Sequence, residues 1–422
     1  MSSAAQPAAA TGPTPPVPLA RNRGFRLLWI GQVLSDTGTE AAQIAYPLLI
    51  LALTHSPTIA GLVGTAELVV QLVLGLPGGA ISDRLDRRLT MIVCDTGRGV
   101  VLALLAALVL LHLVTWPVVL VVAVIDGGAN VLFNPSASAA LPGIVADEQL
   151  ERAWAATEAR TYAASLAGPA LGGFLFGLGR AVPFIADAVS YLVSAGCVSR
   201  IRGRFRAERS RDRKALWREV IDGLHLVWRH PLLRAVVIQA PLVNFAFNGV
   251  IFTITLALRQ HGTPPGVIGL AQAGIAVGGL LGAVIAPKLQ GRLPLWQLAT
   301  IMTATGTALF GVAAALLPST LVALPVAITL LLAPSANAAL FAAMLRAAPE
   351  DMRGRVNSTV IQAAMALAAL APLASGLLVE HFSGQWSMAA FAAAMGISAI
   401  MCVALPGLRN AENAAGRSQT GT

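Results

Sequence analysis

The sequence predicts an all-α membrane protein with twelve transmembrane helices in two parallel six-helix repeats. Three observations lead to this fold class. The 422-residue chain is 56% hydrophobic and only 12% charged, with a mean hydropathy of +0.72, whereas a soluble domain carries about 25% charged residues. Apolar runs of about 20 residues, the length that crosses a bilayer, recur along the chain. Several features of the first half also return in the second half at a nearly constant offset.

Twelve apolar segments are long enough to be spans. In the first half they cover 27–53, 59–81, 90–112, 117–142, 155–177 and 182–200. In the second half they cover 233–258, 266–287, 296–317, 320–345, 356–380 and 386–406. No basic segment and short apolar run precede them, so we expect no cleaved signal peptide.

The polar segments divide the chain into five parts. The Ala- and Pro-rich start predicts a disordered tail, and the charged stretch between the two groups of spans predicts a linker. Within that linker, Leu216, Val220, Leu224 and Val227 have helical spacing, which predicts an amphipathic helix on the membrane surface. The predicted parts are a tail (1–24), a first bundle (25–201), a linker (202–231), a second bundle (232–408) and a tail (409–422).

The Lys and Arg residues predict the orientation in the membrane. With the N-terminus placed inside, 25 of the 29 basic residues fall in cytoplasmic segments, and only Arg180 and Arg259 fall in outside loops. Positive residues are retained on the cytoplasmic side. We therefore expect a multi-pass protein of the inner cell membrane with both termini cytoplasmic. Membrane topology also explains the net charge of +9 without a nucleic-acid partner.

An internal repeat relates the two halves. "DRLDRR" (83–88) is echoed by "PKLQGR" (287–292), and "GPALGG" (168–173) by "APLASG" (371–376). The acidic pair at 147–148 likewise returns at 350–351. Six spans are an even number, so both halves start on the same side and the repeats are parallel. Duplicated bundles of this kind are typical of transporters that bind their substrate between the halves.

The segment "GGAISDRLDRR" (78–88) interrupts this apolar chain with five charges in six residues. It resembles the signature loop between helices 2 and 3 of the major facilitator superfamily, although Asp86 stands where that family usually has Gly. "GPALGG" resembles the helix-5 motif that the family associates with exporters. The matching residues are Gly79, Asp83, Arg84, Arg87 and Arg88 in the loop, and Gly168, Pro169, Gly172 and Gly173 in helix 5.

Three further segments, "FRLLWIGQVLSDTG", "DGLHLVWRHPLLR" and "PEDMRGRVNS", resemble the proton-driven drug-exporter branch that includes enterobactin-type siderophore exporters. The resemblance covers residues 25–408. It implies a secondary active transporter that exports a small amphiphilic molecule, such as a drug, antibiotic or siderophore, in exchange for protons by alternating access. It implies no cofactor, and we expect a monomer whose partners are its substrate, protons and the lipid bilayer.

Three other functions were considered. A proton-coupled importer has the same fold, and only the helix-5 motif argues against it. A membrane sensor would not need acids at mid-membrane depth. An intramembrane enzyme is disfavoured because the chain contains no HExxH, no GxSxG and no cysteine–histidine pairing, and ATP is excluded as the energy source because no phosphate-binding loop occurs.

The resemblance also implies gating roles. Asp83 is expected to bond the N-terminus of helix 11, which would begin near Arg355, and so to hold the cytoplasmic side closed. Asp95 and Arg98 lie three residues apart and are expected to pair with each other or with the Asp83 cluster. A bent helix 5 packed on the second half would close the outer side.

Four acids inside the spans are candidates for proton coupling: Asp36, Glu40, Glu67 and Asp126. A charge at bilayer depth costs about 3 kcal/mol or more, so it must face a cavity or a partner. The sequence shows no obvious cation for these four, and a carboxylate without one takes up a proton readily. Helix 1 is the first choice, because its two acids share one helical face, and Asp126 is the second. Glu158 and Arg160 are expected at the membrane interface.

Neutral polar residues are candidates for the substrate cavity: Asn130, Asn134, Asn244, Asn248, Asn337 and Gln362. Acids in one half and amides in the other favour a cationic or neutral amphiphile over an anion. The three cysteines lie in apolar segments, and neither their spacing nor that of the six histidines predicts a metal site.

Overall fold

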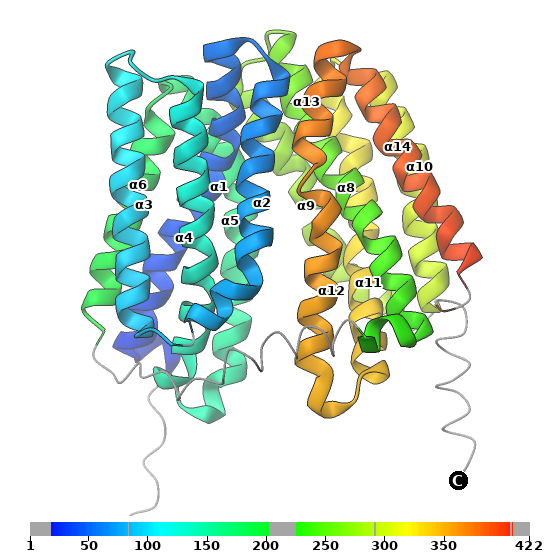
Figure 1. The fold of residues 1–422 in the computed structure, drawn as a ribbon, viewed down its shortest axis with the longest axis horizontal. Coiled ribbons are helices and arrows are strands. Elements are labelled where there is room, and N and C mark those ends of the chain that lie inside the picture. The colour runs from blue at the N-terminus through cyan, green and yellow to red at the C-terminus, as the bar shows by residue number, and fades with distance from the viewer. Residues whose placement is uncertain (1–17, 83, 202–224, 291–292, 406, 408–422) are drawn as a thin grey trace, which may run out of the picture.

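The computed structural model describes residues 18–82, 84–201, 225–290, 293–405 and 407, and it is a bundle of long helices (Figure 1). The helices of the first half are α1 (Arg23–Thr54), α2 (Pro57–Ser82), α3 (Arg87–Leu110), α4 (Trp116–Ala140), α5 (Leu150–Leu178) and α6 (Val182–Ser199). Those of the second half are α8 (Pro231–Gln260), α9 (Pro265–Gln290), α10 (Leu295–Leu316), α11 (Ala323–Ala347), α12 (Arg353–Ala368), α13 (Ala371–His381) and α14 (Gly384–Ala404).

Eleven segments within the described residues are long and apolar enough to cross a membrane, and α12 with α13 forms one of them. In lipid a helix satisfies its own backbone hydrogen bonds, so runs of Leu, Val and Ala form helices there. The 32-residue α1 is not among the eleven, since it also carries charged residues, but it packs on α2, α5 and α6 like any helix of the bundle. The predicted all-helical membrane fold is confirmed.

The helices form two groups that follow the chain order. Helices α1–α6 pack on one another, and α8–α14 do the same. The groups meet mainly where α5 lies on α9 and α2 lies on α13, with a smaller contact between α1 and α8. Figure 1 shows the first group in blue to green and the second in green to red, side by side.

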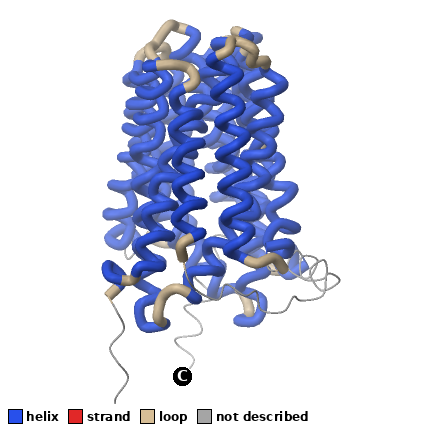
Figure 2. The backbone as a smooth tube through the Cα atoms, turned by 90° about the vertical axis from the view of Figure 1, so that its left-hand side faces the viewer, coloured by secondary structure: helices blue, strands red, loops and turns tan. Residues whose placement is uncertain are grey.

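Apart from the break between α12 and α13, the described connections lie at the two ends of the bundle (Figure 2). We call one the linker end; it holds residues 201 and 225, which flank the linker, together with the first and last described residues. The other, the far end, holds the turns α1–α2, α3–α4, α5–α6, α8–α9, α10–α11 and α13–α14. Residues 1–17 of the first predicted tail, the whole second tail, residues 202–224 of the linker with most of its predicted amphipathic helix, and Asp83 lie outside the described residues. Residues 18–24 of the first tail are described and include a 3-10 turn (Leu19–Arg21) and the start of α1 at Arg23.

Among the described residues, the predicted span at 356–380, the eleventh in the chain, is the one that departs from a continuous helix. It divides into α12 and α13 around Ala369 and Leu370. Pro372 has no backbone N–H to continue the helical hydrogen bonds, and its ring disfavours a straight helix. The next backbone N–H, that of Leu373, instead donates to Thr65 Oγ1 of α2 at 3.0 Å. A side chain of the first half thus accepts the hydrogen bond of a backbone N–H that the helix break in the second half leaves free.

The charged turn between α2 and α3 is built without the glycine usual in the related loops. Asp86 is the N-cap of α3, and its Oδ1 accepts a hydrogen bond from the Leu89 N–H at 2.8 Å. This contact satisfies one of the free donors at a helix start. Arg87 donates to the carbonyl of Ala139, and Arg88 to the carbonyl of Ser199. These arginines therefore tie the turn to the ends of α4 and α6.

Candidate functional site

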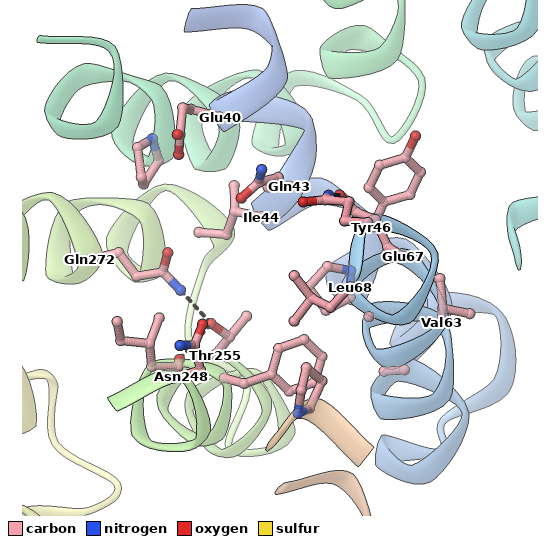
Figure 3. A pocket seen from close by; sticks show the side chains of 18 residues that line it. Glu40, Gln43, Ile44, Tyr46, Val63, Glu67, Leu68, Asn248, Thr255 and Gln272 are labelled. Carbon is pink, nitrogen blue, oxygen red and sulfur yellow. Dashed lines mark hydrogen bonds between the residues drawn. The ribbon is translucent and has the colours of Figure 1, made fainter. Parts of the chain in front are cut away.

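A cavity of about 210 Å³ lies between the two halves (Figure 3). Helices α1 and α2 form one wall and α8 and α9 the opposite wall, with one proline each from α5 and α13. A second cavity of about 170 Å³ continues toward the linker end and shares Leu68, Gln71 and Asn248 with the first. The polar and aromatic lining of the first cavity is Glu40, Gln43, Tyr46, Glu67, Gln71, Asn248, Phe252, Thr255 and Gln272.

Two carboxylates line this cavity, Glu40 from α1 and Glu67 from α2. Glu67 packs over Gly127 of α4, and Gln71 donates to its Oε1 at 3.4 Å. None of the described residues that line either cavity is Lys, Arg or His. The cavity is therefore a place where a cation or a proton is needed to balance charge in a low-dielectric setting.

Arg160, which is buried, forms an ion pair with the partly exposed Asp36 of α1. The Arg160 Nε lies 3.2 Å from Asp36 Oδ2, and the same guanidinium donates to Gln32. The expectation that Asp36 lacks a cation is therefore wrong. Arg160 lies ten residues into α5, so the helix carries it inward to the α1 surface. Asp36 does not line the cavity that its neighbour Glu40 lines.

Asp126 also has a cation, contrary to the sequence-based expectation. Arg98 Nε lies 2.7 Å from Asp126 Oδ1, and both side chains are buried. The guanidinium also stacks on the Tyr191 ring, 4.1 Å from its centroid. Arg98 therefore pairs with Asp126 of α4 and not with Asp95, while Asp83 lies outside the described residues. Asp95 is fully buried, and within the described residues it forms no ion pair.

The predicted amide candidates fall into two groups. Asn248 lines both cavities, and Gln362 lines the one nearer the linker end. The other four do not line them: Asn134 donates to Asn130, Asn244 donates to the Ala240 carbonyl, and Asn337 is exposed.

Sequence reasoning missed four polar residues of the first cavity: Gln43, Gln71, Thr255 and Gln272. Helical spacing could have found two of them. Gln71 follows Glu67 by four residues and Gln43 follows Glu40 by three, so each lies on the same helical face as its acid. Gln272 donates to Thr255, and this bond joins α8 and α9 on the opposite wall (Figure 3).

The helix-5 motif packs on both halves. A Cβ on Gly168 or Gly172 would overlap Glu40 or Ala41 of α1. A Cβ on Gly173 would overlap the Pro265 carbonyl of α9, and one on Gly269 would overlap the Pro169 carbonyl of α5. In each helix a proline lies four residues before the glycine. The carbonyl of that proline contacts the glycine of the other helix. The bare glycines let the two backbones touch.

The crossing of α2 and α13 repeats this arrangement. A Cβ on Gly61 would overlap the Pro372 carbonyl, and one on Gly376 would overlap the Pro57 carbonyl. Both crossings pair a helix that starts at the far end (α2 or α9) with the far-end half of its partner (α13 or α5). Together they hold the two halves in contact between the cavity and the far end.

Substituting Gly173 by alanine is expected to force α5 and α9 apart, since backbone atoms cannot move aside as a flexible side chain can. The matched control is Gly177→Ala, one turn further along α5, where an added Cβ meets nothing within 4 Å. Spin-label distances between far-end loops of the two halves would measure the effect. We expect a longer distance for Gly173→Ala and the parent distance for Gly177→Ala; equal distances for both would contradict this packing argument.

Comparisons with known proteins agree with this geometry. The multidrug efflux pump Tap of Mycolicibacterium fortuitum is 26% identical over 404 residues, which cover 91% of this chain and 96% of Tap. A bacterial homologue of the human lysosomal transporter Spinster, solved in an inward-facing and unoccupied conformation, superposes with a TM-score of 0.73 at 14% identity, covering 93% of this chain and 98% of that one.

A bacterial homologue of the iron transporter ferroportin, in its inward-facing state, gives a TM-score of 0.70 at 16% identity, covering 91% and 98% of the two chains. At such identities these structures show a shared fold. The family model of the Major Facilitator Superfamily matches residues 28–369, which is most of the chain and includes the charged turn, the helix-5 motif and all of the cavity lining except Pro372. This multi-pass membrane protein is therefore a member of the major facilitator superfamily, a family of transporters and not of enzymes.

Proposed function

We propose that this protein is a secondary active transporter that exports a small amphiphilic cation in exchange for protons by alternating access. One observation carries the proposal: the cavity between the halves combines two carboxylates with aromatic and amide groups and has no basic residue in its lining. A lipophilic cation matches this lining in both charge and polarity. The likeness to a multidrug efflux pump supports export and a broad substrate range.

Alternating access is supported by where the halves touch. Close backbone crossings join them between the cavity and the far end. At the linker end, α12 packs mainly on α8 of its own half. A rocking of one half against the other would open the far end only by parting these crossings. With the linker end in the cytoplasm, the structure has the closure expected of an inward-facing exporter.

Proton coupling is assigned to Glu40 and Glu67. A substrate cation and a proton would then compete for the same carboxylates, so that each leaves when the other binds. The remaining two candidates, Asp36 and Asp126, already have arginine partners at 3.2 and 2.7 Å. We assign these two ion pairs to holding α1 on α5 and α3 on α4.

Transport by reconstituted inside-out vesicles tests the proposal. The probes are the lipophilic cations ethidium and tetraphenylphosphonium, added with and without an imposed proton gradient. We expect both cations to accumulate in the vesicles only when the lumen is acidic. Accumulation driven by the opposite gradient would indicate an importer, and no gradient-dependent movement of either cation would contradict the proposed function.

The orientation of the linker is a separate prediction. Residues 202–231 and both termini are expected in the cytoplasm, because most Lys and Arg residues lie at that end. A Ser210→Cys variant should therefore resist a membrane-impermeant thiol reagent in intact cells and react after the cells are broken open. The matched position is Leu113→Cys in the exposed α3–α4 turn at the far end, which should react in intact cells. Rapid labelling of position 210 in intact cells would show the orientation to be reversed.

A further inference from the structure

A carboxylate joins the two halves at the far end. Glu380, on the last turn of α13, accepts a hydrogen bond from Ser56 Oγ at 2.6 Å and another from the Thr58 backbone N–H at 2.8 Å. Ser56 and Thr58 lie at the start of α2, in the first half of the chain, and Glu380 lies in the second. All three groups are close to the end of the bundle, where Glu380 itself is exposed.

The start of α2 offers this carboxylate a favourable site. Pro57 is the first residue of the helix and has no N–H, so Thr58 supplies the first free donor. Ser56 donates its hydroxyl hydrogen to Glu380 and accepts from the Ile59 N–H at 3.2 Å. The carboxylate therefore completes a chain of hydrogen bonds at the positive end of a helix, where a negative charge is stabilised.

This contact can exist only while the halves touch. It lies beside the crossing where Gly61 and Gly376 receive the carbonyls of Pro372 and Pro57. The second crossing, between α5 and α9, has no carboxylate in the corresponding place. The repeat offset of 203 residues that relates "GPALGG" to "APLASG" places Gly177 opposite Glu380. Among the described residues, the charged far-end contact thus belongs to one crossing only.

We propose that Glu380 is a gating residue, a latch that holds the far end closed and is released when α13 moves away from the start of α2. The proposal rests on the alternating access proposed above and adds the residue that sets its balance. At the two crossings, the glycines let the backbones pack closely, but no charged group takes part in those contacts. The Glu380 contact adds an interaction that either forms or is absent, and that water can replace once the halves part.

The opposite directions of α2 and of α12 with α13 suggest a second carboxylate contact at the linker end, as a counterpart to that of Glu380. Helix α2 runs from the far end to the linker end, and α12 and α13 run the opposite way. At the far end, α13 ends beside the start of α2. Glu380 stands at the far end; Asp83 lies outside the described residues, and the family resemblance assigns it the corresponding contact with the start of the helix that begins here at Arg353. Exchange between the two conformations would exchange one carboxylate–helix contact for the other.

The experiment measures the populations of the two conformations, not transport. Spin labels are placed at Leu113 in the α3–α4 turn and at Leu321 in the α10–α11 turn, both exposed at the far end, in a background whose three native cysteines are replaced by alanine. Distance distributions are recorded for the parent protein and for Glu380→Gln, Asp83→Asn and the double variant. His381→Gln is the matched control, since its ring bonds only to its own helix among the described residues.

Loss of the carboxylate charge should increase the ratio of far-end-open to far-end-closed molecules about three- to tenfold in Glu380→Gln. Asp83→Asn should change that ratio in the opposite direction, the double variant should return toward the parent distribution, and His381→Gln should match the parent. Thermal unfolding in detergent, unchanged among these variants, would show that each is folded.

Two results separate the latch from the function on which it rests. If the parent protein shows both conformations and Glu380→Gln leaves their ratio unchanged, the latch is wrong and alternating access stands. If only one far-end distance is seen in the parent and in every variant, including Asp83→Asn, both alternating access and the latch are contradicted. A change in Glu380→Gln toward the closed form would also overturn the latch.

Discussion

Replacement of Glu67 by glutamine is expected to abolish uphill export while leaving downhill movement of the substrate intact. Glutamine keeps the shape of the side chain and can still accept the hydrogen bond from Gln71, but it cannot exchange a proton. Without that exchange the proton gradient has no access to the transport cycle. Glu40→Gln is expected to have the same effect, since Glu40 lines the same cavity, whose described lining contains no basic residue.

The size of this effect follows from the energy available. Exchange of one proton for one monovalent cation moves no net charge, so the pH difference alone drives it; each pH unit provides about 1.4 kcal/mol, which supports roughly tenfold accumulation of substrate. In the Glu67→Gln variant the accumulation ratio should fall to about one. The measurement is ethidium accumulation in vesicles with an acidic lumen, with equilibrium exchange in the absence of a gradient as the control for binding and mobility. Retention of wild-type accumulation by both the Glu67 and the Glu40 variants would show that energy coupling lies elsewhere.

Replacement of Asp126 by asparagine is expected to give the largest loss of stability. It leaves Arg98 buried, at 3% exposure, without its ion partner 2.7 Å away. Removing one member of a buried pair costs about 3–5 kcal/mol, because the remaining charge is uncompensated. Replacing both members together, as Arg98→Met with Asp126→Leu, should recover most of this loss.

A matched control is present at the linker end. Arg353 and Glu350 form an exposed pair at 3.5 Å, and such surface pairs contribute about 0–1 kcal/mol. Glu350→Gln should therefore leave the thermal unfolding temperature in detergent nearly unchanged, while Asp126→Asn lowers it by many degrees. Similar unfolding temperatures for Asp126→Asn and the parent would contradict the structural role assigned to the pair.

The fold could be predicted closely because, in lipid, the backbone must form all of its hydrogen bonds within the protein. Apolar runs of span length become helices, and turn residues mark their ends. The expected span at 155–177 is the middle of α5 (Leu150–Leu178), and most other spans agree to within a few residues. The break between α12 and α13 was not predicted. It depends on an acceptor from the other half, Thr65, that no local pattern reveals.

The site was predicted less completely, because partners at a distance decide the state of a buried charge. The sequence places Asp36 and Asp126 inside spans but cannot show that Arg160 and Arg98 reach them from other helices. Nothing local separates these two acids from Glu40 and Glu67, which have no such partner in the cavity lining. The packing of α1 on α5 and of α3 on α4 makes that distinction.

For the contacts between glycine and proline, in contrast to the buried acids, a local sequence pattern was present but its meaning was not evident. The sequence contains five copies of Pro-x-x-x-Gly, and the four that begin at Pro57, Pro169, Pro265 and Pro372 form the crossings. Only those at Pro169 and Pro372 belong to the sequence repeat that relates "GPALGG" (168–173) to "APLASG" (371–376). The other two gain meaning once the structure shows that each carbonyl of one proline meets the glycine of its partner.

Proton release on substrate binding tests most directly whether substrate and proton compete for the cavity carboxylates. Ethidium is added to purified protein in weakly buffered detergent solution, and a pH-sensitive dye records the protons released. We expect about one proton per bound cation in the parent protein, fewer in Glu40→Gln and Glu67→Gln, and an unchanged number in the Glu350→Gln control. Saturable binding of ethidium to the parent protein with no release of protons would contradict the account.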